Sequence, residues 1–248
     1  MTLHTEIFEQ PERLAALLDH QRQTVIEIAK AIQSRNMQYA FLAARGTSDN
    51  AGRYANYLWG AHNGIPLALA TPSLFTYYQT PPRLNNALVV GVSQSGQSPD
   101  IVSVLEEGRK QGCLTLAITN EPDSPLAKAS EFVLDIQAGV EKAVAATKTY
   151  TAELMAIAMI SAALNPSEER WSELASVSKW AEQTLALDTA IVQMTQRYRY
   201  MNQCVSLGRG FNYATAFEWA LKLKELTYLI AEPYSSADFQ HGPIPTST

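Results

Sequence analysis

The sequence has only two cysteines, no long hydrophobic run and no cluster of basic residues. Cys113 and Cys204 both lie in apolar contexts, which predicts reduced core residues of a cytosolic protein. The longest apolar run, at 154–164, is about half of what a membrane helix needs, and the polar N-terminus does not resemble a signal peptide. With a net charge of −5 and scattered Lys and Arg, nucleic acid is an unfavourable partner. We therefore expect a cytoplasmic globular protein with neither membrane nor nucleic-acid partners.

Common cofactor motifs are also missing. The sequence contains neither GxxxxGK[ST] nor GxGxxG, which are the two common nucleotide-binding loops. His, Cys, Asp and Glu do not occur together at metal-ligand spacing. We expect neither a metal nor a cofactor, and we interpret His4, His20 and His62 as ordinary structural or surface residues.

What the sequence does contain is a regular alternation of short apolar runs and amphipathic segments. The runs at 39–44, 65–70, 86–92, 114–119 and 131–136 predict strands, because each is about six residues long and nearly continuous in apolar residues. Helical periodicity covers 11–34, 51–64, 99–111 and 147–164, with a short helix near 124–130. Further along, 202–208 predicts another strand and 211–230 another helix. This order predicts an α/β fold with a doubly wound parallel sheet flanked by helices, similar to a flavodoxin-like sandwich.

A weak internal repeat suggests a tandem organisation. "AARGTSDNAGRY" at 43–54 resembles "LGRGFNYATAFE" at 207–218, and their Arg-Gly pairs, at 45 and 209, lie 164 residues apart. We expect an N-terminal helix at 1–35, a first α/β domain at 36–165, a helical linker at 166–200 and an incomplete second copy at 201–248. At that offset the counterpart of Ser93 would lie beyond Thr248, so we expect a shortened or truncated chain.

The stretch "VVGVSQSGQSPD", 89–100, places hydroxyl and amide side chains where a buried strand becomes a helix. Ligands of parallel sheets meet helix N-termini at the carboxyl ends of strands, where unpaired N–H groups favour an anion. Neutral donors without lysine or arginine suit a phosphate monoester better than a nucleotide triphosphate. Ser98 suits the N-cap of the following helix and Pro99 its first turn. The alternative is a serine-rich turn that only caps its helix. The candidate donors are Ser93, Gln94, Ser95 and Ser98.

A second polar turn, "ARGTSDN" at 44–50, follows the first predicted strand and places Thr47 and Ser48 at the start of a helix. Helix capping alone would also explain these two residues. Two such turns after adjacent strands of one sheet would meet at one crevice, however, which favours a binding role.

Four motifs in this order resemble the sugar isomerase (SIS) domain family. They are "ARGTSDN", "SQSGQSPD", "VAATKTYT" at 144–151 and "ALKLKELTYLIAEPYSSADFQHGP" at 220–243. The resemblance is strongest to the isomerase half of glucosamine-6-phosphate synthase and to SIS-type glucosamine-6-phosphate deaminases. Arg45 stands where the synthase usually carries cysteine, and this chain has no N-terminal glutaminase domain, so the deaminase branch is favoured.

The resemblance implies roles for individual residues. The four donors of 93–98 would hold the sugar phosphate, Thr47 and Ser48 would contact the sugar, and the segment with Val144 and Ala146 would line the site. Ala146 departs from a serine of the family. Glu225 matches the base that moves a proton between C1 and C2, Lys222 its neighbouring lysine, and His241 the ring-opening histidine, which the family donates across a homodimer interface.

Elementary chemistry agrees with these roles. Lys222 and Glu225 are three residues apart and share a helix face. Aldose–ketose interconversion needs a carboxylate that removes a proton beside a carbonyl or imine, and a second group that opens the ring. A glutamate whose pKa is raised by burial suits the first task and a histidine the second. The structural alternatives are an exposed ion pair and a solvated loop histidine.

The sequence thus predicts a cytoplasmic, homodimeric aldose–ketose isomerase or deaminase acting on a hexosamine 6-phosphate, converting glucosamine 6-phosphate to fructose 6-phosphate and ammonia. Glucosamine, galactosamine and fructosamine phosphates all remain candidate substrates. A non-catalytic sugar-phosphate-binding or regulatory module is one alternative. An inactive truncated fragment is another, because the family closes its site with a C-terminal tail containing a lysine that we do not find here.

Overall fold

The computed structural model describes residues 2–242, and the chain divides into two compact units between Ser178 and Lys179. This division lies within the helix α8 (Glu168–Leu185), inside the segment that the sequence suggests as a linker. None of the helices in the described residues is both long and apolar enough to cross a membrane.

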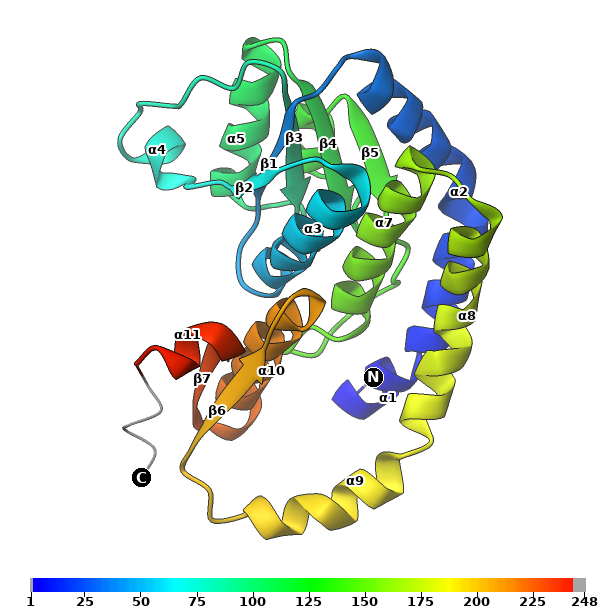
Figure 1. The fold of residues 1–248 in the computed structure, drawn as a ribbon, viewed down its shortest axis with the longest axis vertical. Coiled ribbons are helices and arrows are strands. Elements are labelled where there is room, and N and C mark those ends of the chain that lie inside the picture. Colours follow the sequence, from blue (N-terminus) through cyan, green and yellow to red (C-terminus); the bar gives the residue numbers. More distant parts are fainter. Residues whose placement is uncertain (1, 243–248) are drawn as a thin grey trace. The chain divides into compact units, whose positions relative to one another are not determined.

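The first unit is built on a five-stranded sheet in which every pairing is parallel. The strand order is β2-β1-β3-β4-β5 (Figure 1). The strands are β1 (Tyr39–Ala43), β2 (Leu67–Leu69), β3 (Ala87–Val92), β4 (Leu114–Thr119) and β5 (Phe132–Asp135). The predicted doubly wound parallel sheet is confirmed, and both β3 and β4 are buried at every position, as expected when helices cover both faces.

Helices cover the sheet in two groups (Figure 1). On one side α7 contacts both α2 and α3, and on the other α5 contacts both α4 and α6. The helices of this unit are α1 (Leu3–Phe8), α2 (Gln10–Ser34), α3 (Thr47–Asn63), α4 (Ser73–Thr76), α5 (Pro99–Lys110), α6 (Pro125–Ala129) and α7 (Lys148–Leu164). The sequence did not predict the short helices α1 and α4, whose few residues carry no detectable periodicity.

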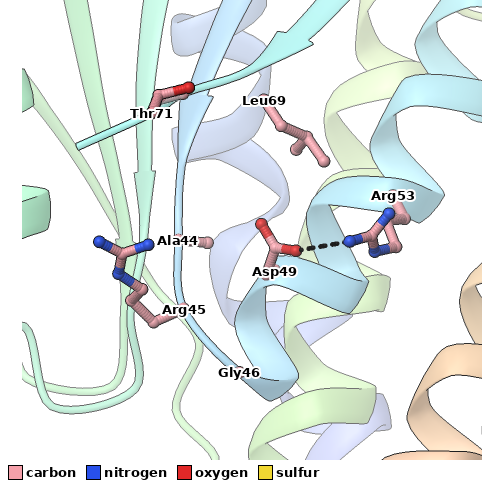
Figure 2. Close-up of a pocket in the computed structure, with 8 residues that line it drawn as sticks. Ala44, Arg45, Gly46, Asp49, Arg53, Leu69 and Thr71 are labelled. Carbon is pink, nitrogen blue, oxygen red and sulfur yellow. Dashed lines mark hydrogen bonds and ion pairs between the residues drawn. The ribbon is translucent and has the colours of Figure 1, made fainter. Parts of the chain in front are cut away.

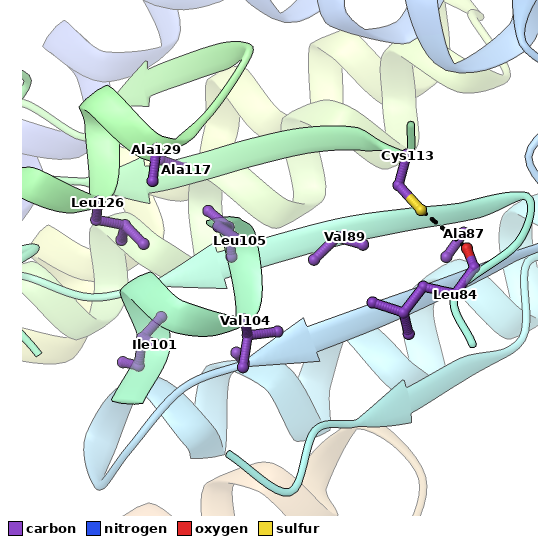
Figure 3. Packing of buried hydrophobic residues seen from close by; sticks show 11 residues of the cluster. Leu84, Ala87, Val89, Ile101, Val104, Leu105, Cys113, Ala117, Leu126 and Ala129 are labelled. Carbon is purple, nitrogen blue, oxygen red and sulfur yellow. Dashed lines mark hydrogen bonds between the residues drawn. The ribbon is translucent and has the colours of Figure 1, made fainter. Parts of the chain in front are cut away.

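The face under α5 shows how the sequence pattern becomes a core (Figure 3). Val104 and Leu105 of α5 are fully buried in one cluster with Val89 of β3 and Ala117 of β4. Burying a side chain such as Leu105 contributes about 1.5–3 kcal/mol relative to leaving it in water. This packing holds the N-terminus of α5 at the carboxyl edge of the sheet.

The second unit contains a parallel pair of strands, β6 (Gln203–Gly208) and β7 (Ile230–Ser235), connected by α10 (Phe211–Thr227) and followed by α11 (Ser236–Gln240). Before them come α9 (Asp188–Thr195) and the 3₁₀ turn Gln196–Tyr198. At the start of α10 the backbone resembles that at the start of α3 in the first unit. The residue before α10, Gly210, has φ of +62°, and its counterpart Gly46 before α3 has φ of +55°. This local match agrees with the 164-residue repeat.

One sequence prediction was wrong in this unit. The helix was expected to continue to residue 230, but α10 ends at Thr227 because Tyr228 adopts the left-handed conformation, with φ of +60°. Glycine is the usual residue there, so a tyrosine gives no stop signal. The strand β7 that follows was also not expected, because it contains Glu232 and Pro233 within its six residues.

Candidate functional site

The strand order reverses between β1 and β3. The chain runs from β1 outward to β2, then crosses back to place β3 on the other side of β1. In open α/β sheets the crevice outside the carboxyl ends of two such strands is the usual ligand site. The segments that follow these two strands are the polar turn 44–50 and the loop 93–98. The expectation that the two turns follow adjacent strands is therefore confirmed.

The loop after β3 folds back on itself. Ser93 is buried, its backbone N–H donates to Ile118 O at 3.1 Å, and its Oγ accepts from the N–H of Gly96 at 3.2 Å. Gly96 has φ of +60°, a backbone conformation that residues other than glycine rarely adopt. Ser95 Oγ accepts from the N–H of Gln97 at 3.4 Å. The loop is thus a compact turn with a defined backbone.

Residues after β4 hold this loop from outside. Gln94 O accepts from the N–H of Asn120 at 3.1 Å and from Thr119 Oγ1 at 3.3 Å. Gly96 O accepts from the N–H of Leu126 at 3.1 Å. Ser124 Oγ, which caps α6, would lie 2.1 Å from a Cβ added at Gly96. This support is not evident from the sequence, because the supporting residues come from a different strand–helix connection.

Ser98 occupies the N-cap position of α5, as the sequence predicts, and Pro99 follows in the first turn. The carbonyl of Ser98 accepts from the N–H groups of Ile101 and Val102, but its side chain makes no capping hydrogen bond. The helix N-terminus therefore carries partial positive charge at the crevice, and the Ser98 hydroxyl is not engaged in capping it.

An ion pair connects the two turns at the crevice. Arg45 Nη2 donates to Asp100 Oδ2 at 2.5 Å, and Thr76 Oγ1 donates to Asp100 Oδ1 at 3.1 Å. The hydrogen bond from Arg45 is the main reason that the pKa of the Asp100 carboxyl lies below its usual range, against the opposing effect of burial. These contacts link the segments after β1 and β2 to the first turn of α5.

Thr47 and Ser48 begin α3, as predicted. Ser48 is buried, and its hydroxyl donates to Glu153 Oε1 on α7 at 2.8 Å. This hydrogen bond uses the hydroxyl proton inside the unit, so only the oxygen lone pairs of Ser48 are available for another donor. The partner on α7 lies 105 residues away along the chain, so no local pattern indicates this contact.

A cavity of about 420 Å³ opens beside this turn, between the ends of β1 and β2. Figure 2 shows Asp49 and Arg53 on α3, joined by an ion pair of 3.2 Å. The residues that line the cavity, Arg45 among them, are Ala44, Arg45, Gly46, Asp49, Arg53, Leu69, Ala70 and Thr71.

The long connection after β5, residues 136–147, carries the two other predicted binding positions. The side chain of Val144 is almost completely exposed and Ala146 is half-buried. The carboxylate of Glu141 accepts from the backbone N–H of Thr147 at 2.8 Å and from its hydroxyl at 2.9 Å, and it also accepts from the Thr149 hydroxyl. The connection is therefore held by specific polar contacts.

The predicted catalytic residues belong to the second unit. On α10, Lys222 Nζ lies 2.7 Å from Glu225 Oε2 and 3.2 Å from Glu218 Oε1. Lys222 thus bridges two carboxylates. Glu218 is buried, whereas Glu225 is exposed, so the burial that sequence reasoning associates with a proton-transfer glutamate is not present around Glu225 within this unit.

His241 follows α11 and is exposed. Its backbone N–H donates to Asp238 O at 3.0 Å, which defines the backbone but leaves the ring at the surface of the unit. Residues 243–248, which include the end of the fourth motif, lie outside the described residues.

Comparisons with known proteins agree with the fold. Residues 35–163 match the family model of the SIS domain. Glutamine–fructose-6-phosphate aminotransferase of Aquifex aeolicus is 34% identical over 242 residues, which cover 96% of this chain and 40% of that protein. The chain thus spans about two fifths of the length of the curated relatives it matches.

Two solved structures are similar over nearly all of this chain. A protein of Silicibacter pomeroyi assigned as a phosphosugar isomerase has a TM-score of 0.91 and 36% identity, covering 98% of this chain and 74% of its own. The C-terminal domain of glucosamine-fructose-6-phosphate aminotransferase from Francisella tularensis has a TM-score of 0.83 and 30% identity, covering 97% and 71%. With the family model matching more than half of the residues, this chain belongs to the SIS domain family.

Proposed function

We propose that this chain binds a sugar 6-phosphate and catalyses isomerase-type proton transfer on it, with a hexosamine 6-phosphate as substrate. The observation that carries the proposal is the position of the two hydroxyl-rich turns at the strand-order reversal of an SIS domain. In that crevice the phosphate would accept hydrogen bonds from Ser93, Gln94, Ser95 and Ser98, and from backbone N–H groups at the start of α5.

The proton transfer is assigned to residues of the second unit. Glu225 would move a proton between C1 and C2 of the sugar. His241 would open the sugar ring, and this histidine would come from the partner subunit of a homodimer. Lys222, whose Nζ lies 2.7 Å from Glu225 Oε2, would orient the carboxylate. General acid–base catalysis of this kind contributes about 10²–10⁴-fold in rate.

For glucosamine 6-phosphate the net reaction consumes one water and yields fructose 6-phosphate and ammonia. Proton transfer from C2 to C1 converts the amine into an imine, and water then replaces ammonia at C2. Arg45 stands where the glutaminase-linked relatives usually carry cysteine, and this resemblance supports the deaminase branch of the family. A single incubation with glucosamine 6-phosphate, assayed for both products, tests the proposal.

The decisive variant is Glu225→Gln, which keeps the size of the side chain and removes the base. We expect it to bind glucosamine 6-phosphate normally and to lose turnover by at least about 10²-fold. Glu232→Gln, on an exposed position of β7 in the same unit, is the matched control and should retain activity. Unchanged turnover in Glu225→Gln would remove Glu225 from the mechanism.

A binding-only role is the second candidate, favoured by Ala146, which replaces a serine of the family, and by the exposure of Glu225. A folded protein that is stabilised thermally by glucosamine 6-phosphate and yet forms neither product would support this alternative.

A further inference from the structure

Helices α1 and α2 precede the segment matched by the family model, which begins at residue 35. The carboxylate of Glu6, in α1, nevertheless reaches the connection 136–147, which carries Val144 and Ala146. The carboxylate of Glu9, between α1 and α2, reaches Lys148 directly after that connection. We propose that α1 and the start of α2 form a positioning element that shapes this connection and so determines how well the sugar part of the ligand is recognised. The inference rests on the proposed function, and it concerns residues that the expected mechanism does not use.

Glu6 makes the central contact. Glu6 is a fully buried residue of α1. Its two carboxylate oxygens accept hydrogen bonds from two consecutive backbone N–H groups, those of Lys142 at 2.6 Å and Ala143 at 3.1 Å. Both oxygens are used, so the two peptide planes are held in direction as well as in position. The next residue, Val144, has a side chain that is 98% exposed.

A buried ion pair holds the end of the same connection. Lys148 begins α7, and its side chain is 0% exposed. Its Nζ donates to Glu9 Oε2 at 2.5 Å, and Arg13 Nη2 lies 3.7 Å from the same oxygen. A buried cation at a helix N-terminus opposes the helix dipole and is costly to desolvate. Glu9 compensates both effects, and the hydrogen bond from Lys148 is the main cause of its lowered pKa.

The start of the connection is held independently by Asn120, which follows β4. Asn120 Oδ1 accepts from the N–H of Ala138 at 2.8 Å, and its Nδ2 donates to Gly139 O at 2.9 Å. The contacts from Glu6 and Glu9 therefore act on the middle of the connection and on the residue directly after it, on either side of Val144 and Ala146.

Charged contacts are an expensive way to attach a helix, because apolar side chains of similar volume often give equal or greater stability. What charged hydrogen bonds add is a fixed orientation of the groups that they join. Glu6 fixes backbone groups rather than side chains, so it defines the path of the chain that leads into Val144. A role in recognition explains this arrangement better than attachment alone.

The test compares two probes on the 248-residue chain by calorimetry. Inorganic phosphate reports on the loop 93–98, and glucosamine 6-phosphate reports on that loop together with the connection 136–147. We expect Glu6→Ala to weaken glucosamine 6-phosphate binding by about tenfold, the size of one lost charged hydrogen bond, and to leave phosphate binding unchanged. Glu6→Gln, which keeps one acceptor oxygen, should show a smaller loss. This graded pair also covers the case in which Glu6→Ala does not fold.

Glu131→Ala is the matched control. It removes the ion pair with Arg35, at 2.5 Å, which also joins the N-terminal region to the strand β5 side of the sheet but includes no residue of the connection. We expect it to alter neither affinity. Equal losses for both probes in the Glu6 variants, or no loss for either, would overturn the positioning role. A wild-type chain that does not bind glucosamine 6-phosphate would instead overturn the proposed function.

Discussion

Replacing Gly96 with alanine tests the central feature of the candidate phosphate loop, its fixed backbone. Gly96 has φ of +60°, and a Cβ at this position would lie 2.1 Å from Ser124 Oγ and 2.5 Å from Ser124 Cβ. Neither distance is compatible with non-bonded contact, so the loop or the start of α6 must move.

The free-energy cost of Gly96→Ala has two parts. A left-handed conformation costs a residue with a Cβ about 1–2 kcal/mol, and forcing extra atoms into a packed site costs about 1–3 kcal/mol. We therefore expect Gly96→Ala to lower the free energy of unfolding by about 2–5 kcal/mol and to weaken phosphate binding.

Gly64→Ala separates the two parts. Gly64 caps the end of α3 with φ of +67°, and nothing lies within 4 Å of a Cβ added there. This variant should show the conformational cost alone, about 1–2 kcal/mol. Urea unfolding followed by circular dichroism measures both variants.

Ser124→Gly provides the rescue. It removes the clashing atoms, and replacing a cap by glycine costs only a few tenths of a kcal/mol. The double variant with Gly96→Ala should recover about 1–3 kcal/mol relative to additivity, and also phosphate binding. Equal costs at Gly96 and Gly64, with no recovery in the double variant, would refute the reasoning.

Two further predictions concern buried titratable groups. Burial raises the pKa of Asp135 above its usual value, against the opposing hydrogen bond from the N–H of Gln137. A raised native pKa means that the ionised form destabilises the fold near pH 7, so Asp135→Asn should increase the free energy of unfolding there. This advantage should shrink as the pH falls through the raised native pKa and be absent below the unfolded-state value of about 4, which urea unfolding at several pH values measures. Cys113 is buried, its thiol donates to Leu84 O at 2.9 Å, and burial raises its pKa. Iodoacetamide at neutral pH should therefore modify the more accessible Cys204 first, and modification of native Cys113 at an equal rate would contradict this packing.

Local patterns were sufficient for most of the elements. The strand at 114–119 matches β4 at both ends, and Pro99 correctly marks the start of α5. These signals are short-range, because continuous apolar runs and helix starts are encoded within a few residues. The same logic failed at Tyr228, where the helix ends on a residue that does not ordinarily adopt a left-handed conformation.

The candidate site was predicted only in part. The sequence located the turns that contain Thr47 and Ser93, since both follow apolar runs. It could not reveal that the Ser48 hydroxyl points to Glu153, or that Arg45 pairs with Asp100. Those partners are separated by 105 and 55 residues, and no local pattern reports such pairs.

The sequence by itself determined the alternation of strands and helices, the polar turns at the strand ends and the resemblance to SIS domains, because each of these depends on residues close together in the chain. Only the tertiary structure decided that β1 lies between β2 and β3, and that Glu6 reaches the backbone at Lys142. Such choices depend on how helices and strands pack over long sequence separations. That packing energy is shared among many weak contacts, and no single segment of the chain encodes it.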